Sequence, residues 1–186
     1  MARVVVGMTM SLDGFINDRE GSVAALYPDF ATLRDSQPMR ESIQNTGAVV
    51  MGWKTFAMAN DPDWYVGNYE YQVPIFVLTR AMPERHPREG GGLSFTFVTD
   101  GLRSAVAQAR AAAGGKDITV VGGARTIQQC IRDGLADEIN IDVMPVLLGG
   151  GLRLFDNLGA DPPQLEREVA LELPGGRTHL RFRVVR

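Results

Sequence analysis

Short apolar runs alternate with amphipathic segments along most of the chain. Residues 3–10 form a continuous apolar run rich in valine, which is typical of a strand covered on both faces of a parallel sheet. Four more runs are short, rich in branched or aromatic residues and bounded by turn residues: 47–51, 73–78, 95–98 and 117–121. Each of these patterns predicts a buried strand.

Helical patterns separate the predicted strands. Apolar spacing predicts a helix over residues 30–45, either continuous or divided near Pro38, because proline is tolerated only in the first turn of a helix. Further helices are expected over 102–113 and over 126–133, where Gly134 ends the pattern. This alternation of strands and helices favours an α/β fold with a doubly wound, mostly parallel sheet.

The C-terminal pattern is different. Residues 165–173 and 178–185 alternate between polar and apolar, and the glycine pair in residues 174–177 suits a tight turn. We therefore predict an antiparallel hairpin that closes the domain. Because no repeat or low-complexity linker interrupts the sequence, residues 1–186 are expected to form one domain.

Composition limits the kinds of partner. A net charge of -3 and a pI near 5.4 provide no general attraction to nucleic acid or to an anionic membrane. Cys130 is the single cysteine and the chain has two histidines, so neither a disulfide nor a metal site is expected. No apolar run is long enough for a membrane span or a secretory signal. We expect a cytoplasmic protein with a small-molecule partner.

The clearest chemical signal is the junction at which residues 117–121 lead into Gly122 and Gly123 and then into a helix. Glycines allow close approach to the main chain, and free N–H groups at a helix N-terminus bind phosphate. A plain tight turn is the alternative interpretation, because such junctions are common in α/β proteins.

Two other predicted strands end in polar side chains. Gly52 is followed by Lys54 and Thr55, which offer a point charge and a hydroxyl, and Thr79 and Arg80 follow another strand. Each side chain could instead be an ordinary surface group or a helix cap. Ligands of open α/β sheets bind beyond the carboxyl ends of the strands, and all three junctions lie there.

Five motifs occur in order along nearly the whole chain: residues 9–16 (TMSLDGFI), 50–55 (VMGWKT), 77–80 (VLTR), 121–125 (VGGAR), and the pair 134–139 and 143–149. Together they resemble the dihydrofolate reductase-like family. The resemblance is specifically to the branch that includes the reductase (C-terminal) domain of the bifunctional riboflavin biosynthesis deaminase-reductase.

The resemblance implies an NADPH site along the strand ends. The pyrophosphate would lie against Gly122, Gly123, Ala124, Arg125 and Thr126, with Gly52, Lys54 and Thr55 opposite. Thr79 and Arg80 would contact the adenosine 2′-phosphate, and the nicotinamide would lie near Thr9 and Ile16. Members of this family are often dimers, so a homodimer is also expected.

The sequence departs from the family at two positions. Val121 stands where the riboflavin enzymes carry a glutamate that meets the substrate, and Trp53 stands where dihydrofolate reductases carry an arginine. The resemblance therefore implies an NADPH-dependent reductase of a small pyrimidine- or pteridine-type heterocycle, similar to 5-amino-6-(5-phosphoribosylamino)uracil reductase. Dihydrofolate reduction and NADPH binding without turnover are the alternatives.

Reduction of a C=N or C=O bond needs a proton donor near the reduced atom. Asp13 and Asp29 are the candidates, and Asp29 follows a proline as the acid of dihydrofolate reductases does. A turn-forming role for Asp13 and an N-cap role for Asp29 are the alternatives. His86 and His179 are expected to be exposed or structural.

Overall fold

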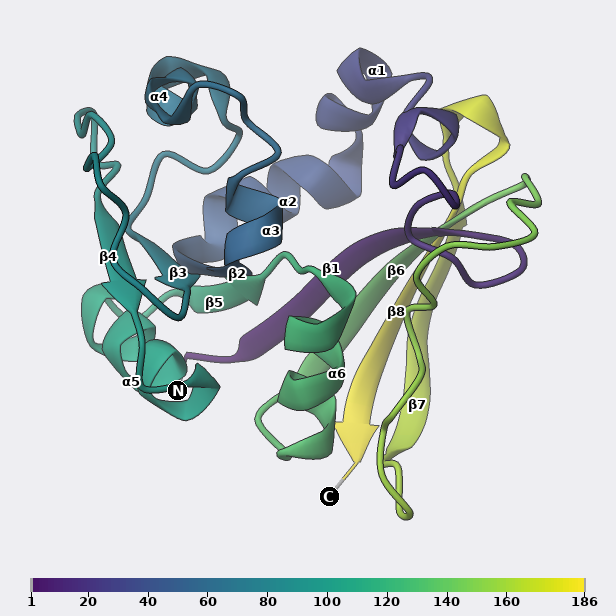
Figure 1. Cartoon of the computed structure of the whole chain (residues 1–186). Helices are drawn as coiled ribbons and strands as arrows, with labels where there is room; N and C mark the ends of the chain where they lie inside the picture. The colour runs from purple at the N-terminus through teal and green to yellow at the C-terminus, as the bar shows by residue number, and fades with distance from the viewer. Residues whose placement is uncertain (1, 186) are drawn as a thin grey trace.

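The computed structural model describes residues 2–185 and contains an eight-stranded sheet in the order β4-β3-β2-β5-β1-β6-β8-β7 (Figure 1). The strands are β1 (Val4–Ser11), β2 (Thr46–Gly52), β3 (Ile75–Leu78), β4 (Phe95–Val98), β5 (Asp117–Val120), β6 (Glu138–Met144), β7 (Gln164–Glu172) and β8 (Thr178–Val185). All pairings among β1 to β6 are parallel, whereas β8 pairs antiparallel with both β6 and β7. The predicted mostly parallel sheet with a C-terminal hairpin is confirmed.

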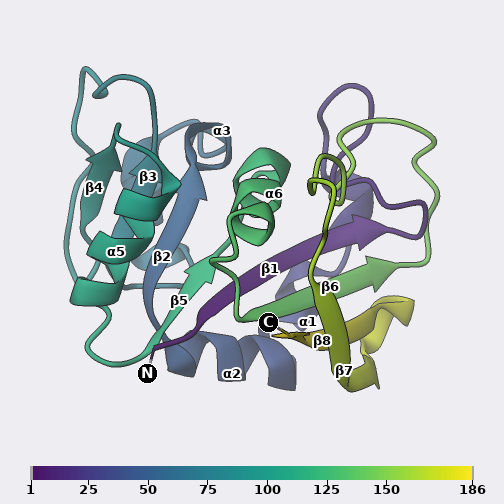
Figure 2. The ribbon, with the colours of Figure 1, turned by 90° about the horizontal axis from the view of Figure 1, so that it is seen from below.

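Helices cover both faces of this sheet. They are η1 (Ala24–Leu26), α1 (Phe30–Arg34), α2 (Gln37–Asn45), α3 (Trp53–Phe56), η2 (Pro62–Trp64), α4 (Tyr65–Asn68), α5 (Leu102–Ala112), α6 (Ala124–Arg132) and η3 (Pro174–Gly176). Helices α1 to α4 lie on one face, and α5 and α6 lie on the other, which faces the viewer in Figure 2. No helix within residues 2–185 has both the length and the apolar character that a membrane crossing requires.

The two faces of the sheet are packed differently. Beneath α5 and α6, the alternate residues Val4 and Val6 of β1 join the larger apolar core. On the opposite face a second cluster, rich in aromatic rings such as Phe56 and Tyr65, covers only the β2–β4 part of the sheet. The β1–β6–β8 part of that face is therefore left for a cleft.

Most predicted boundaries hold within two residues, and two of the deviations have a clear local cause. The segment 30–45 is divided: α1 ends at Arg34, and the Ser36 hydroxyl accepts the Met39 N–H at the start of α2, with Pro38 in its first turn. Helix α6 begins at Ala124 and not at residue 126, because the Gly123 carbonyl accepts the N–H groups of residues 126 and 127.

The C-terminal turn packs against a segment that is distant in the sequence. Gly175 and Gly176 have φ angles of 79° and 75°, as the hairpin prediction requires. A Cβ on Gly175 would lie 2.6 Å from the Asp29 carboxylate, so the turn packs against the segment before α1. Arg177, which the sequence assigned to the turn, is fully buried.

Candidate functional site

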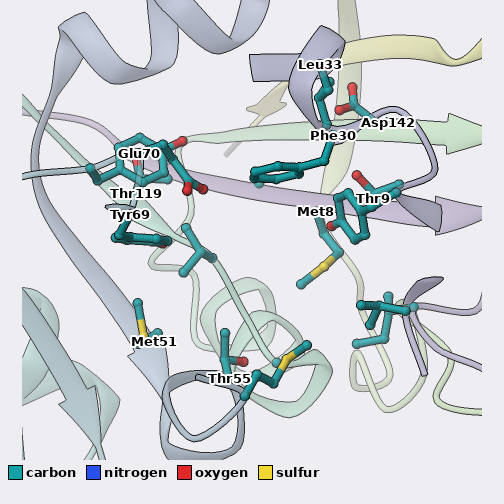
Figure 3. Close-up of a pocket in the computed structure, with 18 of the residues that line it drawn as sticks. Met8, Thr9, Phe30, Leu33, Met51, Thr55, Tyr69, Glu70, Thr119 and Asp142 are labelled. Atoms are coloured by element: carbon teal, nitrogen blue, oxygen red, sulfur yellow. The ribbon is translucent and has the colours of Figure 1, made fainter. Parts of the chain in front are cut away.

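A cleft of about 1090 Å³ lies over the sheet face that carries α1, α2 and α3. Strands β1, β5, β6 and β8 contribute Gly7, Thr9, Thr119, Asp142 and His179 to its floor. Figure 3 shows Tyr69 and Glu70 on one side of the open space, with Met8, Thr9 and Phe30 facing them. The cleft therefore extends from the strand ends that the sequence analysis identified to the polar side chains of Asp142 and His179.

The Gly122-Gly123 junction forms one end of this cleft. The Gly52 N–H donates to the Gly122 carbonyl at 2.7 Å, so the ends of β2 and β5 are joined directly. A Cβ on Gly123 would be 3.5 Å from the Thr55 hydroxyl, and a Cβ on Gly52 would be 2.8 Å from the Thr126 hydroxyl. The peptide bond between the paired glycines is cis. The structure thus brings together five of the residues predicted for the pyrophosphate.

The start of α6 offers free main-chain donors beside these glycines. Within the described chain, no backbone or side-chain acceptor is bonded to the N–H groups of Ala124 and Arg125. The Ala124 side chain is buried and that of Arg125 is exposed, so Ala124 can contribute only its main chain. Free N–H groups and the helix dipole together favour an anion at this position.

The residues predicted for the adenosine 2′-phosphate lie outside the cleft lining. The Thr79 hydroxyl donates to the Ala81 carbonyl at 2.8 Å, and Arg80 is exposed with no ion pair among residues 2–185. Both follow β3, two strands from β5 at the same edge of the sheet. Lys54 does line the cleft, from α3. An adenosine 2′-phosphate would therefore contact Arg80 only outside the cleft.

Both residues predicted near the nicotinamide line the cleft. Thr9 is 3% exposed and accepts a hydrogen bond from Arg177 Nη1 at 3.1 Å. Ile16 is buried and contributes an apolar surface from the segment after β1. Both positions therefore lie in the cleft lining, as a nicotinamide beside the first strand would require.

Asp13 has a different role from the predicted proton donor. Its carboxylate accepts hydrogen bonds from the Ser11 hydroxyl at 2.6 Å and from the N–H groups of Leu148 and Gly149 at 3.1 and 2.8 Å. These donors lower the pKa of Asp13 to about 2, and the hydrogen bond from the Ser11 hydroxyl has the largest effect. Asp13 is not among the cleft-lining residues. It holds the loop after β6, and it is too acidic to donate a proton near neutral pH.

Asp29 is also engaged elsewhere. Its Oδ1 atom accepts a hydrogen bond from Arg177 Nη2 at 2.9 Å, and its side chain makes no capping hydrogen bond to α1. Arg177 donates further to the Leu26 carbonyl at 3.0 Å and to Thr9. Asp29 is outside the cleft lining and acts as the counter-ion of a fully buried guanidinium.

His179, which the sequence analysis expected to be exposed or structural, is a buried residue of the cleft lining. Strand register places Thr9, Asp142 and His179 side by side on β1, β6 and β8. The His179 Nδ1 atom lies 2.7 Å from Asp142 Oδ1, and His179 is only 6% exposed. Its Nε2 atom is buried and has no hydrogen-bond partner among the described residues. Its alternation within β8 was the only sequence signal for an inward-facing side chain.

Glu70 supplies a carboxyl group on the opposite side of the cleft (Figure 3). Burial raises the pKa of Glu70, so the protonated form persists to higher pH than in an exposed glutamate. The neighbouring Tyr71 is likewise affected by burial, which raises its pKa to about 12. Glu70 lies in a segment with no clear periodicity, which explains why the sequence pattern did not single it out.

Residues 2–176 match the family model of the RibD C-terminal domain. The chain belongs to this family. The expected placement in the riboflavin-reductase branch of the dihydrofolate reductase-like fold is thereby confirmed. Among relatives of this RibD C-terminal domain, the uncharacterized protein YwjB of Bacillus subtilis (strain 168) is 26% identical over 173 residues, which cover 93% of this chain and 90% of YwjB.

Solved structures share the fold. A protein from Shewanella sp. PV-4, described as a riboflavin biosynthesis candidate, is 24% identical with a TM-score of 0.80 and 99% of each chain covered. A diaminohydroxyphosphoribosylaminopyrimidine deaminase/5-amino-6-(5-phosphoribosylamino)uracil reductase from Thermotoga maritima is 15% identical with a TM-score of 0.69. The alignment covers 99% of this RibD C-terminal domain and 57% of the Thermotoga chain. At these identities the comparison shows a common architecture.

Two observations bear on the chemistry of this RibD C-terminal domain. Val121, which stands in place of the expected glutamate, lines the cleft beside Thr119 and brings an apolar group to that position. No group of three or more His, Cys, Asp and Glu side chains within residues 2–185 is arranged to hold a metal ion.

Proposed function

We propose that this protein is an NADPH-dependent reductase of a small planar heterocycle of the pyrimidine or pteridine type. The observation that carries the proposal is the glycine junction before α6, which opens into the same cleft as Thr9, Ile16 and the Asp142–His179 pair. Family membership supports a reductase, and the name of the Thermotoga relative supports a heterocyclic substrate.

The residues at the strand ends fit NADPH. Gly123 leaves the main chain open to the cleft, and the N–H groups of Ala124 and Arg125 are free to bind a pyrophosphate oxygen. Lys54 lines the cleft and Arg80 is an exposed cation after β3, so these two residues could pair with a 2′-phosphate. When bound, NADPH would supply the hydride. The chain itself would orient the two reactants over the floor of the cleft and exclude water from it.

We assign the role of proton donor in the reduction to Glu70. Asp13 and Asp29 are both held by strong donors outside the cleft, whereas Glu70 lines it. Burial keeps the Glu70 carboxyl protonated to higher pH, which suits a group that donates a proton from Oε to a substrate nitrogen or oxygen. Asn, Gln or Ala in place of Glu70 should therefore slow turnover without abolishing cofactor binding.

Cofactor binding tests the proposal most directly. Calorimetric titration should show tighter binding of NADPH than of NADH, because charge-assisted hydrogen bonds to the 2′-phosphate are absent with NADH. Arg80→Ala should narrow this preference by about tenfold if one such bond, about 1.5 kcal/mol, is lost. Arg85→Ala is the matched control, because Arg85 already pairs with Asp63. Equal affinity of the wild type for both cofactors would refute the assignment of these strand ends.

Stopped-flow NADPH oxidation identifies the substrate. The riboflavin-pathway intermediate 5-amino-6-(5-phosphoribosylamino)uracil should be reduced poorly, because Val121 offers no hydrogen-bond partner to a polar substrate group. Val121→Glu should improve kcat/KM for this compound. Efficient reduction by the wild type would show that Val121 does not determine specificity. Tight NADPH binding without turnover of this compound, dihydrofolate or related heterocycles would favour a non-catalytic NADPH-binding protein.

A further inference from the structure

The floor of the cleft carries two buried hydrogen-bonding atoms that no described residue satisfies. They are His179 Nε2 on β8 and Asn140 Oδ1 on β6. Both residues line the same cleft. Because Asn140 pairs with Arg181, and Asp142 pairs with His179, the two side chains are diagonal neighbours on adjacent strands.

The tautomer of a neutral His179 ring follows from its partner. Nδ1 lies 2.7 Å from an oxygen of Asp142, and a carboxylate can only accept, so Nδ1 carries the proton. In the neutral imidazole Nε2 then carries a lone pair, and this buried atom has no donor among the described residues. Arg177 Nη1, 3.9 Å from the other oxygen of Asp142, shares that carboxylate and offsets its charge.

The orientation of Asn140 follows in the same way. Its Nδ2 group donates to Glu138 Oε1 at 3.0 Å, which leaves Oδ1 as the atom without a partner. A reversed amide would place two acceptors against each other. Asn140 therefore also presents an acceptor.

Gly7 leaves open space beside Asn140. Gly7 pairs with Asn140 across β1 and β6 and lines the cleft, and a Cβ built on it would meet no atom within 4 Å. A glycine within a strand often marks a close approach of a ligand. Phe30 and Leu33 add apolar surface to the cleft (Figure 3).

We propose that His179 and Asn140 determine substrate specificity by accepting two neighbouring N–H donors from the edge of a planar heterocycle that lies over Gly7. This inference deepens the proposed reductase function and rests on it. A buried acceptor without a donor costs about 1 to 3 kcal/mol. A ring that presents only carbonyl oxygens at this edge would leave both acceptors unpaired and is rejected.

Imidazole nitrogen NMR provides the test, because the chain has only two histidines and His86 lies in a loop away from the cleft lining. The probes are isocytosine, which has adjacent ring N–H and amino donors, and 1,3-dimethyluracil, which has carbonyl acceptors and no N–H. Both are added to the ¹⁵N-histidine-labelled protein without cofactor. We expect isocytosine to shift the Nε2 resonance of His179 and to leave His86 unchanged.

Affinity completes the test. Isocytosine should bind at least about tenfold more tightly than 1,3-dimethyluracil, and Asn140→Ala should remove most of that preference. This variant retains the His179–Asp142 pair, so it separates recognition from folding. Equal affinities for the two probes, or a protonated Nε2 in the free protein, would overturn the inference.

Cofactor titration keeps the two proposals distinguishable. If NADPH does not bind but isocytosine shifts the Nε2 resonance of His179, the reductase assignment fails and the proposed recognition by His179 and Asn140 stands. If NADPH binds and neither probe shifts the Nε2 resonance of His179 at saturation, only the proposed recognition by His179 and Asn140 fails.

Discussion

At the scale of single residues, one buried cation organises the end of the cleft. Arg177 is fully buried, bonds to Thr9, Leu26 and Asp29, and lies near Asp142. A charge removed from water in this way is tolerated only with several partners. The arrangement therefore depends on residues from three distant parts of the sequence.

Removal of this cation should be costly. Arg177→Ala leaves the Asp29 carboxylate partly buried and without its partner, so we expect a loss of about 3 to 5 kcal/mol in the free energy of unfolding. Urea denaturation measures it. Arg183→Ala, which removes an exposed pair with Glu166, should cost less than about 1 kcal/mol. Similar losses for the two variants would contradict this account of Arg177.

Glu70 should make stability depend on pH. Its folded-state pKa is raised by burial, so the ionised form destabilises the folded state as the pH rises through that pKa. Glu70→Gln should therefore raise the melting temperature above the wild type near neutral pH. This difference should vanish as the pH falls below the ordinary glutamate pKa of about 4.3. Thermal melts over this range check the sign, and a variant less stable at neutral pH would disprove it.

At the scale of elements, the junction between β5 and α6 assigns different roles to two neighbouring glycines. Gly122 has a φ of 118°, and a Cβ there would lie 2.5 Å from the Met8 side chain. Gly123 has a φ of -68°, which any residue can adopt, and its nearest neighbour is the Thr55 hydroxyl at 3.5 Å. The first glycine is needed for the fold, and the second leaves access to the main chain.

This difference predicts opposite outcomes for matched substitutions. Gly122→Ala should destabilise the protein by about 1 to 3 kcal/mol, because a side chain at this φ is strained. Gly123→Val should unfold at nearly the wild-type urea concentration but lose NADPH affinity by at least about tenfold, because its side chain occupies the phosphate approach. Unchanged NADPH affinity in Gly123→Val would contradict the assignment of the Gly123 main chain to the pyrophosphate site.

At the scale of the whole molecule, the loops at the carboxyl ends of β1 and β6 expose apolar side chains. Leu12 and Leu147 are 65% and 73% exposed, and the Leu12 N–H bonds to the Val146 carbonyl, so the loops are adjacent. Neighbouring apolar side chains in water often mark a contact with another protein. They are consistent with the homodimer expected from the family.

Association can be measured directly. Sedimentation equilibrium of the wild type should give twice the chain mass of 20.3 kDa. Leu147→Asp should shift the protein toward monomer. When the variant and the wild type are compared at the same fraction of monomer, their melting temperatures should be equal. Leu171→Asp, on the exposed edge strand β7, is the control and should leave the mass unchanged. A monomeric wild type at micromolar concentration would refute the dimer.

The sequence by itself determined the elements and their order, because burial and local turn chemistry leave a periodic signal within a short window. The valine-rich first strand and the glycine junction before α6 could both be recognised in this way, whereas the division near Pro38 was one of two alternatives that the pattern allowed. Only the tertiary structure decided which side chains meet. Thr9, Asp142 and His179 form one row because β1, β6 and β8 are neighbours in the sheet, although β8 ends the chain. The same folding turned Asp13 and Asp29 toward other partners, since a local pattern specifies the backbone but not the long-range contacts that fix the role of a carboxylate.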